Sequence, residues 1–359
     1  MSGETEKIAE MAKRISKDVF KWFKWQLIPL YDQNFDCLKQ EKHAPTKKQE
    51  HTHPVDIVFS YNDPYLDHPI LLNTDLKSYS KTSIRSTSIR SALKSLALTI
   101  DCARVSEEWR TRYDTTGTAE IRGLLFVYNH DAEWDRDFAN LLIQPKKKKK
   151  EESEEGEQSL NANTLPLDAG LLIHVVEPRT IAYMTTIVAD AQRLHAEGTF
   201  PSTNYYFFYP DLKLHRTRGD KYSHPATIEM ICGPFLVVEH AEITKYDEVA
   251  KEPKVTYQPG FVIFYNRPGD SHLEFMYLFD VLSTYQILNG SSKLRIRVAH
   301  HSPNKNIRSN FIRAIDMYVH DWGFDDYKRG YLESIEFEII EIQKSAFCQV
   351  EIGWERKGK

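Results

Sequence analysis

Two aspartates and a lysine in the first quarter of the chain have the types and spacing of a hydrolytic metal site. Asp56 lies in an apolar run at residues 55–59. A second apolar run, at residues 70–72, leads into Asp75 and Lys77. The residues between the runs are rich in Asn, Asp and Pro, which is typical of a turn between two neighbouring strands.

If the two strands pair, Asp56 and Asp75 converge at one edge of a sheet. Lys77 then lies on the same face as Asp75, because side chains two residues apart in a strand point the same way. Carboxylate oxygens bind hard divalent cations. Such a cation and an ammonium group can position and polarise a water molecule that attacks phosphorus. The pattern therefore predicts phosphodiester hydrolysis.

An acid at the head of one strand, followed by acid-x-Lys at the end of an apolar strand, resembles the PD-(D/E)xK nuclease superfamily. The resemblance covers the signature and its flanking elements, not the C-terminal part. The chain departs from the common pattern at Asp75, where Glu is more usual. It also departs at Pro54, which is one residue too far from Asp56 to make a literal Pro-Asp. It implies that Asp56 and Asp75 bind Mg²⁺ or Mn²⁺, and that the backbone carbonyl of Leu76 adds a ligand. It also implies that Lys77 orients the water and stabilises developing charge.

Two other acid-x-Lys triplets, at residues 211–213 and 252–254, are weaker candidates. Pro210 interrupts the strand before the first, and Pro253 within the second indicates a loop. Neither has the strand-initial acid shortly upstream that residues 75–77 have.

A basic segment directly follows the predicted site. Residues 77–100 contain no acid, and interleaved serines and threonines are suitable donors to phosphate oxygens. Residues 86–100 are expected to form a helix. DNA binding beside the metal site and an ordinary solvated helix face are equally supported. The candidate DNA contacts are Lys81, Arg85, Arg90 and Lys94.

A second basic pattern lies near residue 295. Lys293, Arg295 and Arg297 alternate with apolar residues, so one face of the expected strand is basic and is a candidate nucleic-acid surface. The favoured alternative is charge pairing across a sheet with Glu336 and Glu338, which alternate in the last expected strand.

The N-terminal residues 5–27 are expected to form a helix, because apolar residues recur at three- and four-residue spacing. Enzymes of the resembled superfamily often carry an extra acid on this helix, a role that Glu4 or Glu10 would fill. Two solvated glutamates at a helix start are the favoured alternative. Residues 42–53 are expected to be a solvated loop, although His51 and His53 within them could bind a metal.

The alternation of strands and helices over residues 120–210 indicates an α/β fold. We expect a restriction-endonuclease-like mixed sheet flanked by helices at residues 1–215. A charged, low-complexity insertion near residues 145–163 is expected to be disordered. Residues 216–359 are expected to form a C-terminal α/β domain or extension for recognition or assembly.

The composition of the 359 residues limits the function further. The net charge of −4 means that DNA binding requires local basic patches. The four cysteines show no Cys-x-x-Cys spacing, which argues against a zinc site or disulfides and fits a reducing cytosol. No apolar run is long enough for a membrane span, so we expect a soluble, cytoplasmic protein.

These patterns together predict a metal-dependent DNA endonuclease, with a protein partner or a second copy of the chain. The resemblance to the PD-(D/E)xK superfamily, which many prokaryotic defence effectors use, implies a role as a prokaryotic defence effector. The alternative is a non-catalytic binding or assembly subunit that keeps a nuclease-like fold and acts through protein contacts.

Overall fold

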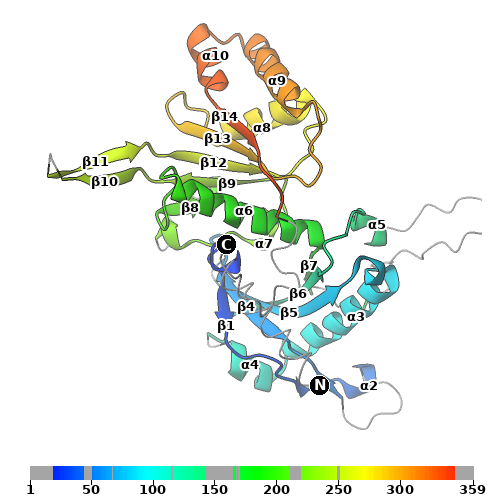
Figure 1. The fold of residues 1–359 in the computed structure, drawn as a ribbon. Helices are drawn as coiled ribbons and strands as arrows, with labels where there is room; N and C mark the ends of the chain where they lie inside the picture. The colour runs from blue at the N-terminus through cyan, green and yellow to red at the C-terminus, as the bar shows by residue number, and fades with distance from the viewer. Residues whose placement is uncertain are drawn as a thin grey trace, which may run out of the picture. The chain divides into compact units, whose positions relative to one another are not determined.

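The computed structural model describes residues 19–43, 51–66, 68–114, 116–142, 165–166, 168, 170–210, 220–248 and 251–343. Among these residues, those up to Ile181 form one compact unit and Ala182–Gln343 form a second (Figure 1). Each unit contains a mixed five-stranded sheet flanked by helices, which confirms the predicted α/β class. None of the helices in these ranges combines the length and hydropathy that a bilayer span requires.

The first sheet begins with two antiparallel pairings and continues with two parallel ones. Its strands in spatial order are β1 (Gln26–Ile28), β4 (Ile57–Asn62), β5 (Pro69–Tyr79), β6 (Glu120–Asn129) and β7 (Ile173–Val176). Strand β6 is an interior strand of the sheet. It lies between β5 and β7, which explains why its residues are apolar without alternation.

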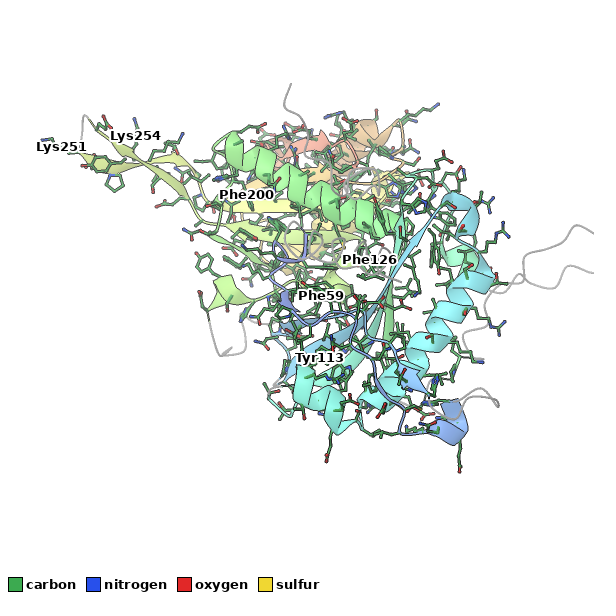
Figure 2. All side chains as sticks on the ribbon, turned by 60° about the horizontal axis from the view of Figure 1, so that its bottom comes forward. Phe59, Tyr113, Phe126, Phe200, Lys251 and Lys254 are labelled. Carbon is green, nitrogen blue, oxygen red and sulfur yellow. The ribbon has the colours of Figure 1, made fainter. Side chains whose placement is uncertain are left out.

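Helix α3 (Ser86–Ala103) connects the parallel strands β5 and β6, and the predicted helix over residues 86–100 is confirmed. One face of α3 packs on the sheet through Ile89, Leu93 and Leu96. Strand β4 contributes Phe59 to the packing (Figure 2). The ring centroid of Phe59 lies 4.6 Å from that of Phe20. The smaller elements of this unit are β2 (Phe35–Asp36), α2 (Gln40–His43), β3 (Thr52–His53), η2 (Lys81–Ser83), α4 (Glu107–Tyr113) and α5 (Ala139–Leu142).

The second sheet consists of β8 (Tyr205–Phe207), β9 (Phe235–His240), β12 (Gly260–Tyr265), β13 (Lys293–Val298) and β14 (Glu336–Ile339), in that spatial order. The helices that complete the second unit are α6 (Pro178–Ala196), which begins at the end of the first unit, η5 (Lys221–Ser223), α7 (Ile228–Ile231), α8 (His272–Thr284), α9 (Ile307–Trp322) and α10 (Asp326–Glu333). A hairpin of β10 (Ile243–Asp247) and β11 (Glu252–Tyr257) projects from this sheet, with Lys251 and Lys254 near its tip (Figure 2).

The two sheets share one topology. In the second sheet, as in the first, the strands follow chain order, with two antiparallel pairings and then two parallel ones. A helix joins the third strand to the fourth in both, α3 in the first unit and α8 in the second. The order and direction of strands are therefore repeated within the chain.

Two predicted elements differ from the structure, and others lie outside the described residues. The helix over residues 5–27 is wrong at its end, because residues 26–28 pair with β4 as strand β1. Residues 1–18, which include Glu4 and Glu10, lie outside the described residues, as does the charged insertion near 145–163. The loop over residues 252–254 is wrong, because these residues pair in the β10–β11 hairpin.

The division between the compact units also differs from the expected domain boundary. It lies at residues 181/182, whereas the sequence placed a boundary at 215/216. The strand near residue 205, assigned from sequence to the N-terminal domain, pairs with β9 of the second sheet. Pairing across the sheet, which local sequence does not specify, decides to which unit this strand belongs.

The basic face of β13 is turned inward. Arg295 is only 2% exposed and donates hydrogen bonds to the hydroxyl and carbonyl oxygens of Thr199. Arg297 is 3% exposed, and its Nε donates to Asp190 Oδ2 at 2.8 Å. The interpretation of these arginines as a nucleic-acid surface is therefore wrong, because α6 covers this face of the strand.

The alternative of charge pairing across the sheet is confirmed. β13 and β14 are parallel neighbours, and Arg297 forms an ion pair with Glu338. Lys293 Nζ lies 2.9 Å from a carboxylate oxygen of Glu336 and also sits over the ring of Tyr257. Lys293 and Arg297 of β13 thus pair with acids of their own unit.

We predict that Arg297→Met lowers the free energy of unfolding by about 3 kcal/mol, because Asp190 loses its buried partner and retains only the more exposed Arg193. Urea denaturation followed by circular dichroism measures the loss. Arg329→Met, which removes an exposed ion-paired arginine of α10, is the control and should change stability little. Equal effects of the two substitutions would contradict the prediction.

Candidate active site

The pairing of β4 with β5 brings the two predicted acids together. The antiparallel register places Ile57 opposite Thr74, so that Asp56 and Asp75 come next on their strands. Asp56 Oδ2 accepts a hydrogen bond of 2.8 Å from the backbone N–H of Leu76. The strand pairing expected from the sequence is confirmed, and the Asp56 side chain reaches across to β5.

Lys77 completes this group. Its Nζ lies 2.5 Å from Asp75 Oδ1, and both side chains are partly buried. The two residues are two positions apart in β5 and so share a face of the sheet. Burial disfavours the ammonium ion, but the carboxylates of Asp75 and Asp56 outweigh that effect and raise the pKa of Lys77. The side chain is therefore a cation at neutral pH.

The surroundings of the Asp56 carboxyl favour a bound cation. Burial raises the pKa of the Asp56 carboxyl, and the neighbouring Asp75 carboxylate raises it further, to about 7. The hydrogen bond from Leu76 and the charge of Lys77 act in the opposite direction but are weaker. Two adjacent carboxylates that are partly removed from water repel each other, and a divalent cation relieves that repulsion. The donor set fits a hard metal ion.

A cavity of about 460 Å³ opens beside these three residues. One wall is the edge of β4 and β5, and the other is the face of α3 that carries small polar side chains. The α3 residues that line it are Ser88, Ser91, Ala92, Ser95, Leu96 and Thr99. Because hydroxyl groups suit phosphate oxygens, the cavity offers a metal-binding edge opposite a hydrogen-bonding wall.

Sequence reasoning did not select these wall residues individually, nor Thr74 and Tyr79, which also line the cavity. The signal was present for α3, since serines and a threonine recur on one side of a helix whose other side is apolar. Thr74 and Tyr79 are ordinary strand residues by type. Only the position of the cavity marks them.

The predicted DNA contacts on and before α3 lie in different environments. Lys81 Nζ is 2.7 Å from Asp135, so its charge is paired. Arg85 Nε donates to the carbonyl oxygen of Thr82 at 2.7 Å, and the side chain is exposed. Lys94 is exposed as well, and Arg90 is partly buried. The role of all four in binding DNA stays a prediction.

Two carboxylates and an ammonium group at one edge of a mixed sheet are the constellation of a phosphodiester hydrolase. Residues 1–164 match the family model for the GAPS4 protein PD-(D/E)XK nuclease domain. The N-terminal part of the chain is thus a PD-(D/E)XK nuclease domain of the GAPS4 type, as the resemblance of its motif implied. This family typically uses a divalent metal.

The match includes the candidate site and ends before the second unit begins. Comparison with curated proteins gives no match. Comparison with solved structures gives none either.

The second unit does not repeat the acids of the first. At the place that corresponds to Asp56, one residue before the strand, β9 is preceded by Pro234. The register of β9 and β12 brings Pro234 opposite Asn266, and the Asn266 N–H donates to the Pro234 carbonyl at 2.8 Å. Pro268 follows where Lys77 stands in the first unit. The repeated topology therefore carries one candidate metal site of this kind, in the first unit.

We predict that Asp56→Asn flattens the pH dependence of stability in metal-free protein. The pKa of Asp56 is higher in the folded than in the unfolded chain, so the folded state loses stability as the pH rises from about 4 to about 7. Asn removes this titration while retaining an acceptor for the Leu76 N–H. The melting temperature is measured in EDTA at several pH values between pH 5 and pH 8, the range in which Asp56 of the folded protein ionises. It should fall less with rising pH in Asp56→Asn than in wild type.

Glu107→Gln, which removes an exposed carboxylate at the start of α4, is the control and should keep the wild-type slope. A wild-type slope in Asp56→Asn would show that this carboxyl is not perturbed by its surroundings.

Proposed function

We propose that this protein is a metal-dependent endonuclease that hydrolyses phosphodiester bonds of DNA as a prokaryotic defence effector. The observation that carries the proposal is the meeting of Asp56, Asp75 and Lys77 at the edge of a cavity with a hydroxyl-rich opposite wall. The match to a nuclease domain of a defence type supports the same reaction class.

In this proposal Asp56 and Asp75 hold Mg²⁺ or Mn²⁺ through carboxylate oxygens, and the backbone carbonyl of Leu76 adds a ligand. The ion would supply Lewis-acid stabilisation of a phosphoryl oxygen and a lower pKa for water. Lys77, held 2.5 Å from Asp75, orients the attacking water and stabilises the negative charge that develops at phosphorus.

The substrate phosphates would lie against α3. The hydroxyl groups of Ser91 and Ser95 line the cavity and are exposed at its surface, so they can donate to phosphate oxygens. Arg85 and Lys94 are exposed near the same wall and supply positive charge. In a protein of net charge −4, such a local patch is what DNA binding requires.

The second unit has a different role in this proposal. It repeats the strand topology of the nuclease domain but has Pro234 and Asn266 at the corresponding edge, and its buried arginines are paired internally. We therefore assign it to recognition or assembly, through contacts with DNA, a protein partner or a second copy of the chain. If the first unit is also inactive, the protein is a non-catalytic binding or assembly subunit.

We predict that wild-type protein cleaves supercoiled plasmid or single-stranded DNA in Mg²⁺ or Mn²⁺, and that Asp75→Ala and Lys77→Ala each lower the rate at least about 100-fold. The first substitution removes a metal ligand, and the second removes the cation at the reacting phosphate. Gel electrophoresis of the products measures the rate, and Glu107→Gln is the control that should cut like wild type.

Cutting that survives both substitutions would place the active site elsewhere in the chain. Wild-type protein that cuts neither substrate with either ion would favour the assembly role.

We predict that Arg85→Ala and Lys94→Ala weaken DNA binding by the cleavage-deficient Lys77→Ala protein, because each removes one exposed cation near the hydroxyl wall. Each should lower the slope of log affinity against log salt by about 1. Fluorescence anisotropy with a labelled duplex at several salt concentrations measures both quantities. Lys305→Ala, which removes an exposed lysine of the second unit, is the comparison. Unchanged affinity and salt slope with both Arg85→Ala and Lys94→Ala would refute binding along α3.

A further inference from the structure

A second group of metal-ligating side chains lies in the first unit, separate from the residues that line the candidate active site. Its members are two cysteines and two histidines, all buried, whose potential ligand atoms lie within 4.8 Å of one another. They are Cys37, His43, His53 and Cys102. The first three come from a segment of 17 residues that precedes β4, and the fourth comes from α3.

Different elements supply the four residues. Cys37 directly follows β2, and His53 ends β3, which pairs with β2 so that His53 lies opposite Phe35. His43 is the last residue of α2. Cys102 lies near the end of α3 and is fully buried.

Four of the six distances between the potential ligand atoms match those in a tetrahedral zinc site, and all six lie within 4.8 Å. With Zn–S bonds of about 2.3 Å and Zn–N bonds of about 2.0–2.1 Å, a tetrahedron has edges of about 3.8 Å between sulfurs, 3.6 Å between sulfur and nitrogen, and 3.3 Å between nitrogens. The two sulfurs lie 3.8 Å apart. His43 Nδ1 lies 3.6 Å from Cys37 Sγ, 3.3 Å from Cys102 Sγ and 3.3 Å from His53 Nε2. These four lengths differ from the ideal edges by at most about 0.3 Å.

The other nitrogen of His43 is held as metal-bound imidazoles usually are. His43 Nε2 lies 3.0 Å from Asp101 Oδ2, which leaves Nδ1 facing the two sulfurs. Lys39 and Lys42 contact the same carboxylate, at 2.6 and 3.4 Å. A carboxylate behind a ligating histidine fixes the tautomer and the ring orientation and makes the imidazole a better ligand. The group therefore has an ordered outer shell as well as four ligands.

We propose that Cys37, His43, His53 and Cys102 bind one structural Zn²⁺ ion. Two thiolates and two imidazoles gathered at one buried place select zinc among the common divalent ions. All four positions are filled by protein atoms, so no coordination site is open to water or substrate. The site differs in this respect from the carboxylate edge near Asp75, and it stands whether or not the chain cleaves DNA.

The position of the site gives the ion a mechanical role. His53 lies three residues before Asp56, and Cys102 lies on the helix that carries Ser95 of the cavity wall. Zinc joins the chain just before β4 to the C-terminal part of α3. The two walls of the candidate active site are thereby fixed relative to each other.

The structure corrects one expectation from the sequence at this place. Residues 42–53 were expected to be a solvated loop, but His43 and His53 are only 6% and 2% exposed. The cysteine spacing did not indicate this group, because Cys37 and Cys102 are 65 positions apart and meet only in the fold.

The test is zinc analysis of the full-length protein, purified without added metal and under reducing conditions. Inductively coupled plasma mass spectrometry should find about one Zn per chain, and Cys37→Ser and His53→Ala should each abolish it. Cys232→Ser, at an exposed cysteine outside the group, should retain it. Asp75→Ala should also retain zinc while losing DNA cleavage, which separates this proposal from the proposed nuclease function.

Two measurements on the wild-type protein do not depend on whether the variants fold. X-ray absorption at the zinc edge should show two sulfur and two nitrogen neighbours at about 2.3 and 2.0 Å. Blocking the thiols with a mercurial should release the zinc to a metallochromic dye. Protein without zinc, or a disulfide between Cys37 and Cys102 in non-reduced peptides, would overturn the proposal.

Discussion

The repulsion between Asp56 and Asp75 is the interaction on which the functional part of this protein depends. The β4–β5 register brings the two carboxylates together at one edge of the sheet, and the Leu76 N–H holds Asp56 in that place. Like charges at a partly buried edge are unfavourable unless a cation is present. Lys77 supplies one cation, and the remaining acceptor oxygens suit a divalent metal. The arrangement therefore lowers the stability of the fold but provides a site for a cation, as is common at functional sites.

Helix α3 connects the separate parts of the first unit. Its apolar face packs on the sheet, its hydroxyl-bearing face forms a wall of the cavity, and its C-terminal end carries Cys102 and Asp101. Two acids that repel each other stay close together only where the surrounding structure holds them in place. The proposed zinc site provides such rigidity, since it ties the chain leading into β4 to the end of the same helix.

The second unit shares the strand topology of the first but has different residues at the corresponding edge. Its sheet has the strand order and directions of the nuclease domain, but Pro234 and Asn266 stand where the acids would be. Two of its arginines act within the core instead: Arg297 is held by Asp190 and Glu338, and Arg295 bonds to Thr199. Such buried ion pairs fix the arrangement of neighbouring elements rather than offer charge to a ligand. The absence of the carboxylate pair at this edge of the second unit agrees with the role in recognition or assembly that we propose for it.

The sequence by itself determined the features that depend on local periodicity. The two-residue period of a strand put Asp75 and Lys77 on one face, and the helical period predicted a helix over residues 86–100, which lies within α3. Only the tertiary structure decided which residues far apart in the chain meet. Cys37 and Cys102 come together because β2 and α3 pack against each other, and Arg297 is buried because α6 covers its strand. Spacing along a chain reports a shared face within one element, whereas contacts between elements depend on packing that no local pattern encodes.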